Sequence, residues 1–150
     1  MDVYDLSDIV NIVKIEEARA KNWTVGRPLR ITPSVRQPRG PGSRALYSVE
    51  DLYLVALLDE LWRAGLTAKA LGRILDALPD IRDVFNTPNA SLLVLHMRGK
   101  ETGMELIKEG RNPSFNTRKR RDLPVHHVIN LTALKAKVNA GIVKAEKGRK

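Results

Sequence analysis

The chain has 150 residues, 43% of them hydrophobic, which excludes a wholly disordered chain and fits one globular domain, alone or with a small appendage. It has no cysteine, which excludes disulfides and thiolate metal sites, and no apolar run approaches the ~20 residues that a membrane span requires. The formal net charge of +9 arises in the second half, because Lys and Arg balance Asp and Glu over residues 1–80. An excess of this sign favours nucleic acid or another anionic surface as the partner.

The first part of the chain predicts two short helices joined by a brief turn. Asp5 is a good N-cap for the first helix, and Asp8 places a second carboxylate near its positive end. The apolar residues of this helix recur at i, i+3, i+4 and i+7: Leu6, Ile9, Val10 and Val13. Residues 16–23 predict the second helix, with acidic residues before basic ones, as the helix dipole favours. The pair predicts a helix-turn-helix.

The segment 27–44 is strongly cationic and has no helical pattern. It contains five arginines and four prolines but no carboxylate. A proline disfavours helix at the residue before it. Leu29–Ile31 and Leu46–Tyr47 predict two short strands, and the sequence Gly40-Pro41-Gly42 predicts a flexible tip between them. These features together predict a hairpin wing.

Two more helices are predicted between residues 48 and 78. Ser48 and Asp51 form a capping-box-like start, and the helix that follows is apolar on most sides as far as Arg63. This pattern predicts a buried central helix. Gly65 lies where a left-handed C-cap would end this central helix. Thr67 is the expected N-cap of the next helix, and Pro79 stops it.

Residues 81–150 predict a small module of strands and one helix. After a polar connector, Phe85 to Asn89, three short strands are expected: 91–97, 104–108 and 125–129. Asn130 can cap a final helix, whose end from Lys144 onward we expect to fray. The predicted fold class is therefore α+β, with one domain over residues 1–80 and a small α/β module over residues 81–150.

One motif in the first half resembles a known family. Tyr47-Ser48-x-x-Asp51-Leu52, a leucine-rich helix, Ala64-Gly65-Leu66-Thr67 and a further amphipathic helix are similar to the MerR family of bacterial winged-helix regulators. The resemblance covers about residues 4–78. It implies a winged helix-turn-helix of about four helices plus a wing hairpin, with the second helix in the DNA major groove and the wing over the flanking backbone.

The resemblance also implies roles for individual residues. Three residues of the second helix are expected to face base edges, namely Arg19, Lys21 and Asn22. Phosphate contacts that fix the register are expected from Arg27, Arg30, Arg36, Arg39, Arg44 and Tyr47. A second basic patch consists of Arg118, Lys119, Arg120 and Arg121, and it is open to three interpretations: a second phosphate contact, a dimer surface or a solvated loop. By their spacing, Trp23 and Trp62 are expected in the core.

Catalysis, metal binding and cofactor binding are not expected. The sequence has no Ser-His-Asp set, no GxGxxG motif and no P-loop. His126 and His127 are adjacent on a predicted strand, where they would point to opposite faces and could not easily bind one metal ion. We therefore expect a binding protein and not an enzyme.

The expected function is sequence-directed binding of double-stranded DNA by a bacterial or phage MerR-like transcriptional regulator, located in the cytoplasm at the nucleoid. A homodimer is expected because one recognition helix contacts only a few base pairs. The module 81–150 would dimerise, sense a ligand or bind a protein partner. Two alternatives stay open: a DNA-binding antitoxin whose C-terminal module binds an enzyme, and an excisionase-like architectural protein.

Overall fold

The computed structural model describes residues 2–26, 29–98, 101–108 and 125–149. Its elements, in chain order, are α1 (Leu6–Ile9), the π-helical turn η1 (Val10–Lys14), α2 (Glu17–Val25), α3 (Val49–Arg63), α4 (Ala68–Ala77), the 3₁₀-helix η2 (Ile81–Asn86), β1 (Ala90–Arg98), β2 (Glu101–Lys108), β3 (Val125–Asn130) and α5 (Leu131–Gly148). Helices and a small antiparallel sheet occur together, so the predicted α+β class is confirmed.

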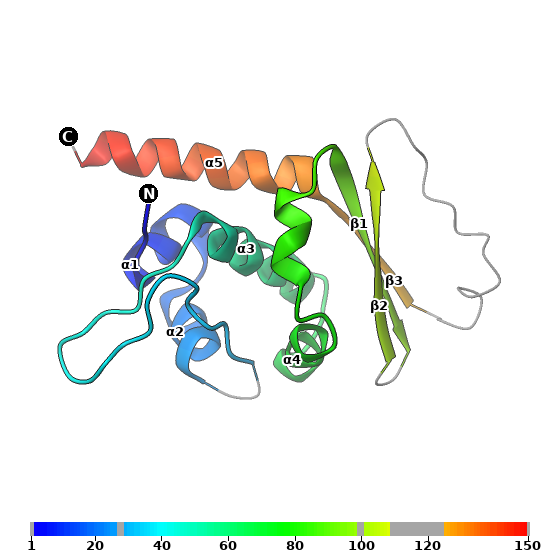
Figure 1. Cartoon of the computed structure of the whole chain (residues 1–150), viewed down its shortest axis with the longest axis horizontal. Helices are drawn as coiled ribbons and strands as arrows, with labels where there is room; N and C mark the ends of the chain where they lie inside the picture. The colour runs from blue at the N-terminus through cyan, green and yellow to red at the C-terminus, as the bar shows by residue number, and fades with distance from the viewer. Residues whose placement is uncertain (1, 27–28, 99–100, 109–124, 150) are drawn as a thin grey trace.

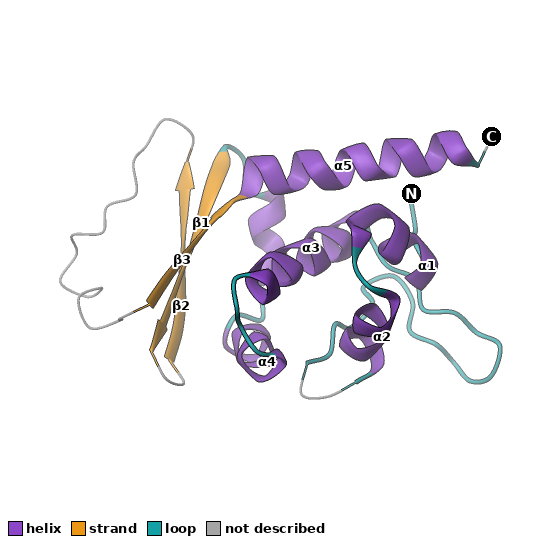
Figure 2. Ribbon diagram, turned by 180° about the vertical axis from the view of Figure 1, so that it is seen from behind, coloured by secondary structure: helices purple, strands orange, loops and turns teal. Residues whose placement is uncertain are grey.

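The helices are arranged around α3, and the sheet lies at one end of the molecule. Figure 1 shows α5 running along one side of α3, while α2 and α4 lie on the other side. The opposite end of the molecule carries a loop that projects away from the helices, and Figure 2 shows the same loop from behind. The N-terminus lies near the C-terminal end of α5 in both views.

The sheet is antiparallel and has the strand order β2-β1-β3. In the register, Leu93 of β1 stands opposite Leu106 of β2 and Ile129 of β3. Leu93 and Leu95 are fully buried and belong to the hydrophobic core, since alternate residues of a strand face the same side. This side of the sheet therefore packs against the helices.

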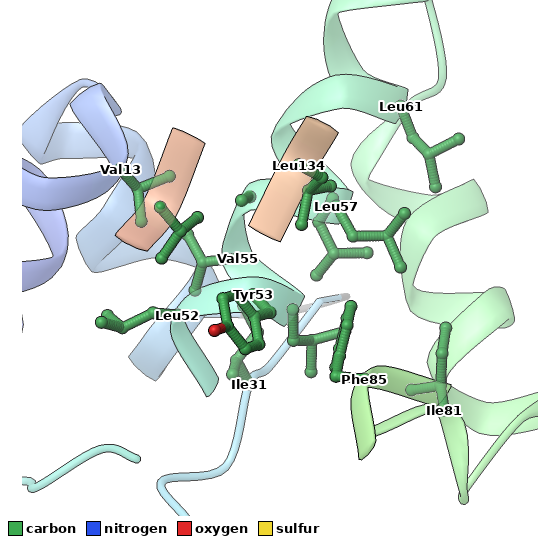
Figure 3. Packing of buried hydrophobic residues seen from close by; sticks show 14 of the residues in the cluster. Val13, Ile31, Leu52, Tyr53, Val55, Leu57, Leu61, Ile81, Phe85 and Leu134 are labelled. Atoms are coloured by element: carbon green, nitrogen blue, oxygen red, sulfur yellow. The ribbon is translucent and has the colours of Figure 1, made fainter. Parts of the chain in front are cut away.

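The core is one cluster of buried residues centred on α3. Ten of the 15 residues of this helix are buried, which confirms that it is the central buried helix. Figure 3 shows Leu57 of α3 near Leu134 of α5, and Tyr53 near Phe85 of η2. The cluster thus contains residues from both sides of the expected boundary at residue 80.

The predicted helix ends are confirmed where they depend on residues close together in sequence. Asp5 and Ser48 each form a complete capping box, with Asp8 and Asp51 respectively. The other predicted boundary residues also have the expected roles: Gly65 has a positive φ of 105°, Thr67 accepts from the Ala70 N–H at 3.2 Å, and Asn130 accepts from the Ala133 N–H at 2.9 Å.

The predicted wing strands are wrong in their extent. Leu29 and Ile31 are each 1% exposed and pack into the core without forming a strand, and the Ile31 N–H donates to the carbonyl of Trp23 at 2.6 Å. Leu46 and Tyr47 each form an isolated β-bridge and not a strand. Leu29 and Ile31, on either side of Arg30, are thus buried in the core and do not pair with a second strand of a hairpin.

Three expectations outside the wing are also corrected. Phe85 belongs to η2, not to a polar connector, and it is buried because it packs against Tyr53 with ring centroids 5.4 Å apart. Helix α5 continues to Gly148, where we expected fraying, since Ile142 and Ala145 pack against the core. Trp62 is 39% exposed, whereas Trp23 is buried as predicted.

Candidate nucleic-acid interface

Helix α2 has one buried face and one exposed face. It is preceded by a tight turn in which Lys14 has a positive φ of 65°. The buried face repeats at i, i+3 and i+4: Ala20, Trp23 and Thr24. The exposed face carries Glu17, Ala18, Lys21, Asn22 and Val25. This face is the part of α2 that a macromolecular ligand could contact.

Arg19 is not on the exposed face of α2, which corrects its expected role at base edges. Its Nη2 donates to Oδ1 of Asp59 at 2.5 Å, across to α3. Its guanidinium carbon lies 5.6 Å from the centroid of the Trp23 ring and 5.7 Å from that of Trp62. Position 19 is one helical turn before Trp23, so it faces α3 for the same reason as Trp23 does. Arg19 therefore holds α2 against α3.

Lys21 and Asn22 are exposed, as a contact with base edges would require. The Lys21 ammonium lies 3.3 Å from Oε1 of Glu17, one turn earlier, and both side chains are more than half exposed. The interaction between two such exposed side chains is weak, and a competing anion or base edge can displace Glu17 from Lys21. The side chains of Lys21 and Asn22 are thus available to a ligand.

Val25 is an exposed residue at the end of α2 that the sequence interpretation missed. Its exposed fraction is 73%, the highest value among the exposed large hydrophobic residues of the described chain. A helical spacing of i, i+4 and i+7 from Ala18 through Asn22 could have indicated this position, because it follows the face opposite the buried one. An exposed valine next to polar side chains extends the candidate contact surface.

The cationic loop (residues 29–46) begins at a base in which Leu29 and Ile31 are buried, and its later part is the projecting loop of Figures 1 and 2. Arg36 and Leu46 form a backbone bridge, with N–H to O distances of 2.8 and 3.1 Å, and Ser43 closes the tip by accepting from the Arg39 N–H and donating to the Gly40 carbonyl. All four described arginines of the loop are exposed: Arg30, Arg36, Arg39 and Arg44. The loop is thus an ordered turn with guanidinium groups in solvent.

Two of these arginines have partners within the loop region. The Arg36 guanidinium donates to the carbonyl of Arg44 at 3.3 Å. Arg44 lies 3.4 Å from Asp5, but its side chain is 79% exposed, so this pair is worth little. Within the described part of the chain, Arg30 and Arg39 form no ion pair. Arg27 and the predicted patch of Arg118, Lys119, Arg120 and Arg121 lie outside the described residues.

Tyr47 is buried and is not placed to contact a phosphate, which corrects its expected role. Its exposed fraction is 2%, and its backbone pairs with that of Tyr4 at 2.8 and 3.0 Å. Burial raises the pKa of the Tyr47 hydroxyl, an effect that its hydrogen bond with the Thr24 side chain opposes. Tyr47 thus joins the end of the cationic loop to the core beside α2.

A groove of about 750 Å³ separates the cationic loop from α1 and α2. Its apolar lining residues are Leu6, Val10, Val25, Pro38 and Ala45. Asp5 and Glu17 line it as well, together with Arg44. Because the two carboxylates would repel a phosphate, this groove is unsuited to a nucleic-acid backbone, and the exposed Arg36 and Arg39, which do not line it, are better placed for one.

In the part of the chain that the structure describes, no group of three or more His, Asp or Glu residues could hold a metal ion. None of the described helices combines the length and the apolar character needed to cross a membrane.

Comparison with known proteins adds no family: no family model matches the chain, and no curated protein matches it. The resemblance to the MerR family therefore stays a prediction that depends on the motifs themselves.

Proposed function

We propose that this protein binds double-stranded DNA in a sequence-directed way, as a MerR-like winged helix-turn-helix regulator. In this proposal α2 enters the major groove and the cationic loop crosses the neighbouring backbone. The observation that carries the proposal is a projecting loop with three exposed arginines, Arg36, Arg39 and Arg44, and a fourth, Arg30, at its base, beside an exposed helix face.

The exposed face of α2 offers the chemistry that base recognition needs. Lys21 can donate to the O6 and N7 acceptors of guanine, and Asn22 can form two hydrogen bonds with adenine. Val25 can pack against a thymine methyl group. Arg19 supports this face indirectly, because its ion pair with Asp59 fixes α2 on α3.

The cationic loop supplies the sequence-independent part of the affinity. Glu16, the N-cap of α2, and Glu17, its first residue, repel DNA, so the loop must outweigh a local negative charge. Each guanidinium that neutralises a phosphate releases counterions, and the slope of log K against log salt steepens by about 0.9 for each contact. The loop thus also fixes the register in which α2 meets the bases.

A homodimer is part of the proposal, because a single α2 contacts too few base pairs to define a site in a genome. Two copies related by a twofold axis would bind a palindromic site, as expected for a bacterial or phage transcriptional regulator. The arrangement of sites would distinguish the related possibilities: one short palindrome supports a regulator, whereas tandem cooperative sites indicate an architectural protein.

The test begins with selection of bound duplexes from a random pool, followed by titration of the selected and of an unrelated duplex at several salt concentrations. The triple variant Arg36→Ala, Arg39→Ala, Arg44→Ala should weaken binding to both duplexes and reduce the salt slope by up to about 2.7. The matched control removes three exposed lysines of α5, on the far side of α3: Lys137→Ala, Lys144→Ala, Lys147→Ala. The triple lysine variant should retain most of the salt dependence of the wild-type protein.

A second variant tests the α2 face separately. Asn22→Ala should cost about 1–3 kcal/mol of discrimination at one base pair and leave the salt slope unchanged. Failure of the selection to enrich any sequence would contradict sequence-directed binding. Equal loss of slope in the two triple variants would contradict the assignment of the loop.

A further inference from the structure

The base of the cationic loop is fixed by a buried carboxylate. Asp51, in the first turn of α3, is 0% exposed. Its Oδ2 accepts from the Ser48 N–H at 3.0 Å, from the Ser34 N–H at 2.9 Å and from the Ser34 hydroxyl at 2.6 Å. The same carboxylate that caps α3 therefore also binds the loop where it leaves the core.

The second oxygen of Asp51 binds a residue from the C-terminal half of the chain. Nε of Arg82, at the start of η2, donates to Oδ1 of Asp51 at 2.8 Å. Nη2 of the same guanidinium donates to the carbonyl of Thr32 at 2.8 Å. Arg82 thus bridges α3 and the first residues of the loop base, and its side chain is 31% exposed.

We propose that Arg82 is a positioning residue for DNA binding, which fixes where the cationic loop stands relative to α2. This inference rests on the proposed function. Beyond its base the loop has one backbone bridge, between Arg36 and Leu46, so its own hydrogen bonds do not determine its direction. One end of the loop is held by the bridge between Tyr47 and Tyr4, and the other end is held at Thr32 and Ser34. Arg82 contacts this second end directly or through Asp51.

The guanidinium is suited to this task because its planar fork can reach two acceptors at once. A lysine has a single donor nitrogen, so it cannot reproduce the two separate nitrogens, Nε and Nη2, with which Arg82 reaches the Asp51 carboxylate and the Thr32 carbonyl. Without either bond the loop base would sample more conformations, and DNA binding would have to order it again at a cost in affinity. Specific binding should suffer most, since it requires α2 and the loop to engage together.

The experiment compares Arg82→Ala and Arg82→Lys with a control that removes a different basic side chain bonded to η2, the 3₁₀-helix that contains Arg82. Lys135 of α5 donates to the Phe85 carbonyl at 2.7 Å, and Lys135→Ala therefore also removes a positive charge bonded to η2. Two readouts are taken at a temperature where every variant is folded. The first is affinity for the selected and the unrelated duplex, and the second is hydrogen exchange at the amides of Ser34, Arg36 and Leu46.

Arg82→Ala is expected to weaken binding to the selected duplex about tenfold and to lower its ratio over the unrelated duplex. In Arg82→Ala, hydrogen exchange at the three loop amides should also accelerate. Arg82→Lys should give affinities and exchange rates between those of the wild type and Arg82→Ala. Lys135→Ala should change neither the affinities nor the exchange rates. Unchanged specificity and unchanged loop exchange in Arg82→Ala, with only a lower melting temperature, would overturn the inference. If the wild-type protein itself binds no selected duplex, the proposed function fails, and this inference fails with it.

Discussion

Arg19 of α2 and Asp59 of α3 form an ion pair at 2.5 Å, and the same guanidinium lies near the rings of Trp23 and Trp62. Asp59 is 5% exposed and also binds Nε of Arg63 at 3.0 Å. A basic residue in the centre of the proposed recognition helix is thus used to hold that helix in place. Its loss should be detected as lost stability before it is detected as lost recognition.

We expect Arg19→Ala to lower the free energy of unfolding by about 2 kcal/mol, because a buried carboxylate loses one of its two cationic partners. Urea denaturation followed by tryptophan fluorescence measures this, and both tryptophans of the chain lie beside Arg19. The control Lys21→Ala removes an exposed pair with Glu17 and should change stability by less than about 0.5 kcal/mol. Equal effects of the two substitutions would contradict the buried role of Arg19.

The fragment 1–80 should not fold cooperatively by itself, although the sequence suggested a separate domain. This fragment lacks Phe85, Leu134 and Val138, which belong to the same core cluster as the buried residues of α3. The apolar side of α3 that these residues cover would then face water. Thermal melting followed by circular dichroism tests this, and a sharp transition close to that of the full chain would show that the expected boundary is real.

Gly141 of α5 should not tolerate a larger residue. A Cβ at this position would lie 2.5 Å from the backbone oxygen of Ile12 in η1. We therefore expect Gly141→Ala to destabilise the protein by about 1–3 kcal/mol, although alanine favours helix. Gly148→Ala is the matched control in the same helix, since nothing lies within 4 Å of its Cβ, and it should be neutral or slightly stabilising. Denaturant melts of the two variants give the comparison.

The three tyrosines should make the protein less stable at alkaline pH. Burial raises the pKa values of Tyr4, Tyr47 and Tyr53 above 10.0 in the folded chain. Below pH 10 these groups stay protonated in both states and leave stability unchanged. Above pH 10 the unfolded chain loses their protons first, so the free energy of unfolding falls until the folded pKa values are reached.

Phenolate absorbance measures this titration directly. The folded protein should titrate above pH 10, and the same protein in concentrated urea should titrate near 10, the value for an exposed phenol. Coincident titration curves in the two solvents would contradict the burial of these side chains.

The starts of α1 and α3 could be predicted from the sequence because each depends on neighbouring residues. Asp5 binds the N–H of Asp8, and Ser48 binds that of Asp51, both three positions later. A cap of this kind forms as soon as the backbone turns, whatever packs around it. Strands β1 and β2 were found for a similar reason, since their apolar runs and the intervening turn lie close together in the chain.

The candidate interface could be predicted only in part. The exposed arginines follow from a segment rich in proline and glycine, which cannot easily pack. The burial of Tyr47 does not follow from its own motif, because it depends on Tyr4 and Thr24. The exposure of Val25 likewise depends on which side of α2 meets α3.

By itself the sequence determined where most of the helices begin, where the three strands of the sheet lie and which segment concentrates the arginines, because these properties depend on residues a few positions apart. Only the tertiary structure decided which of the cations face solvent. Arg19 binds the carboxylate of a residue 40 positions away in the sequence, and Arg82 binds one 31 positions away. No local sequence pattern therefore distinguishes these two structural arginines from the exposed Arg39. Long-range packing places a guanidinium either beside a buried acid or in solvent, and it does so by bringing distant helices together.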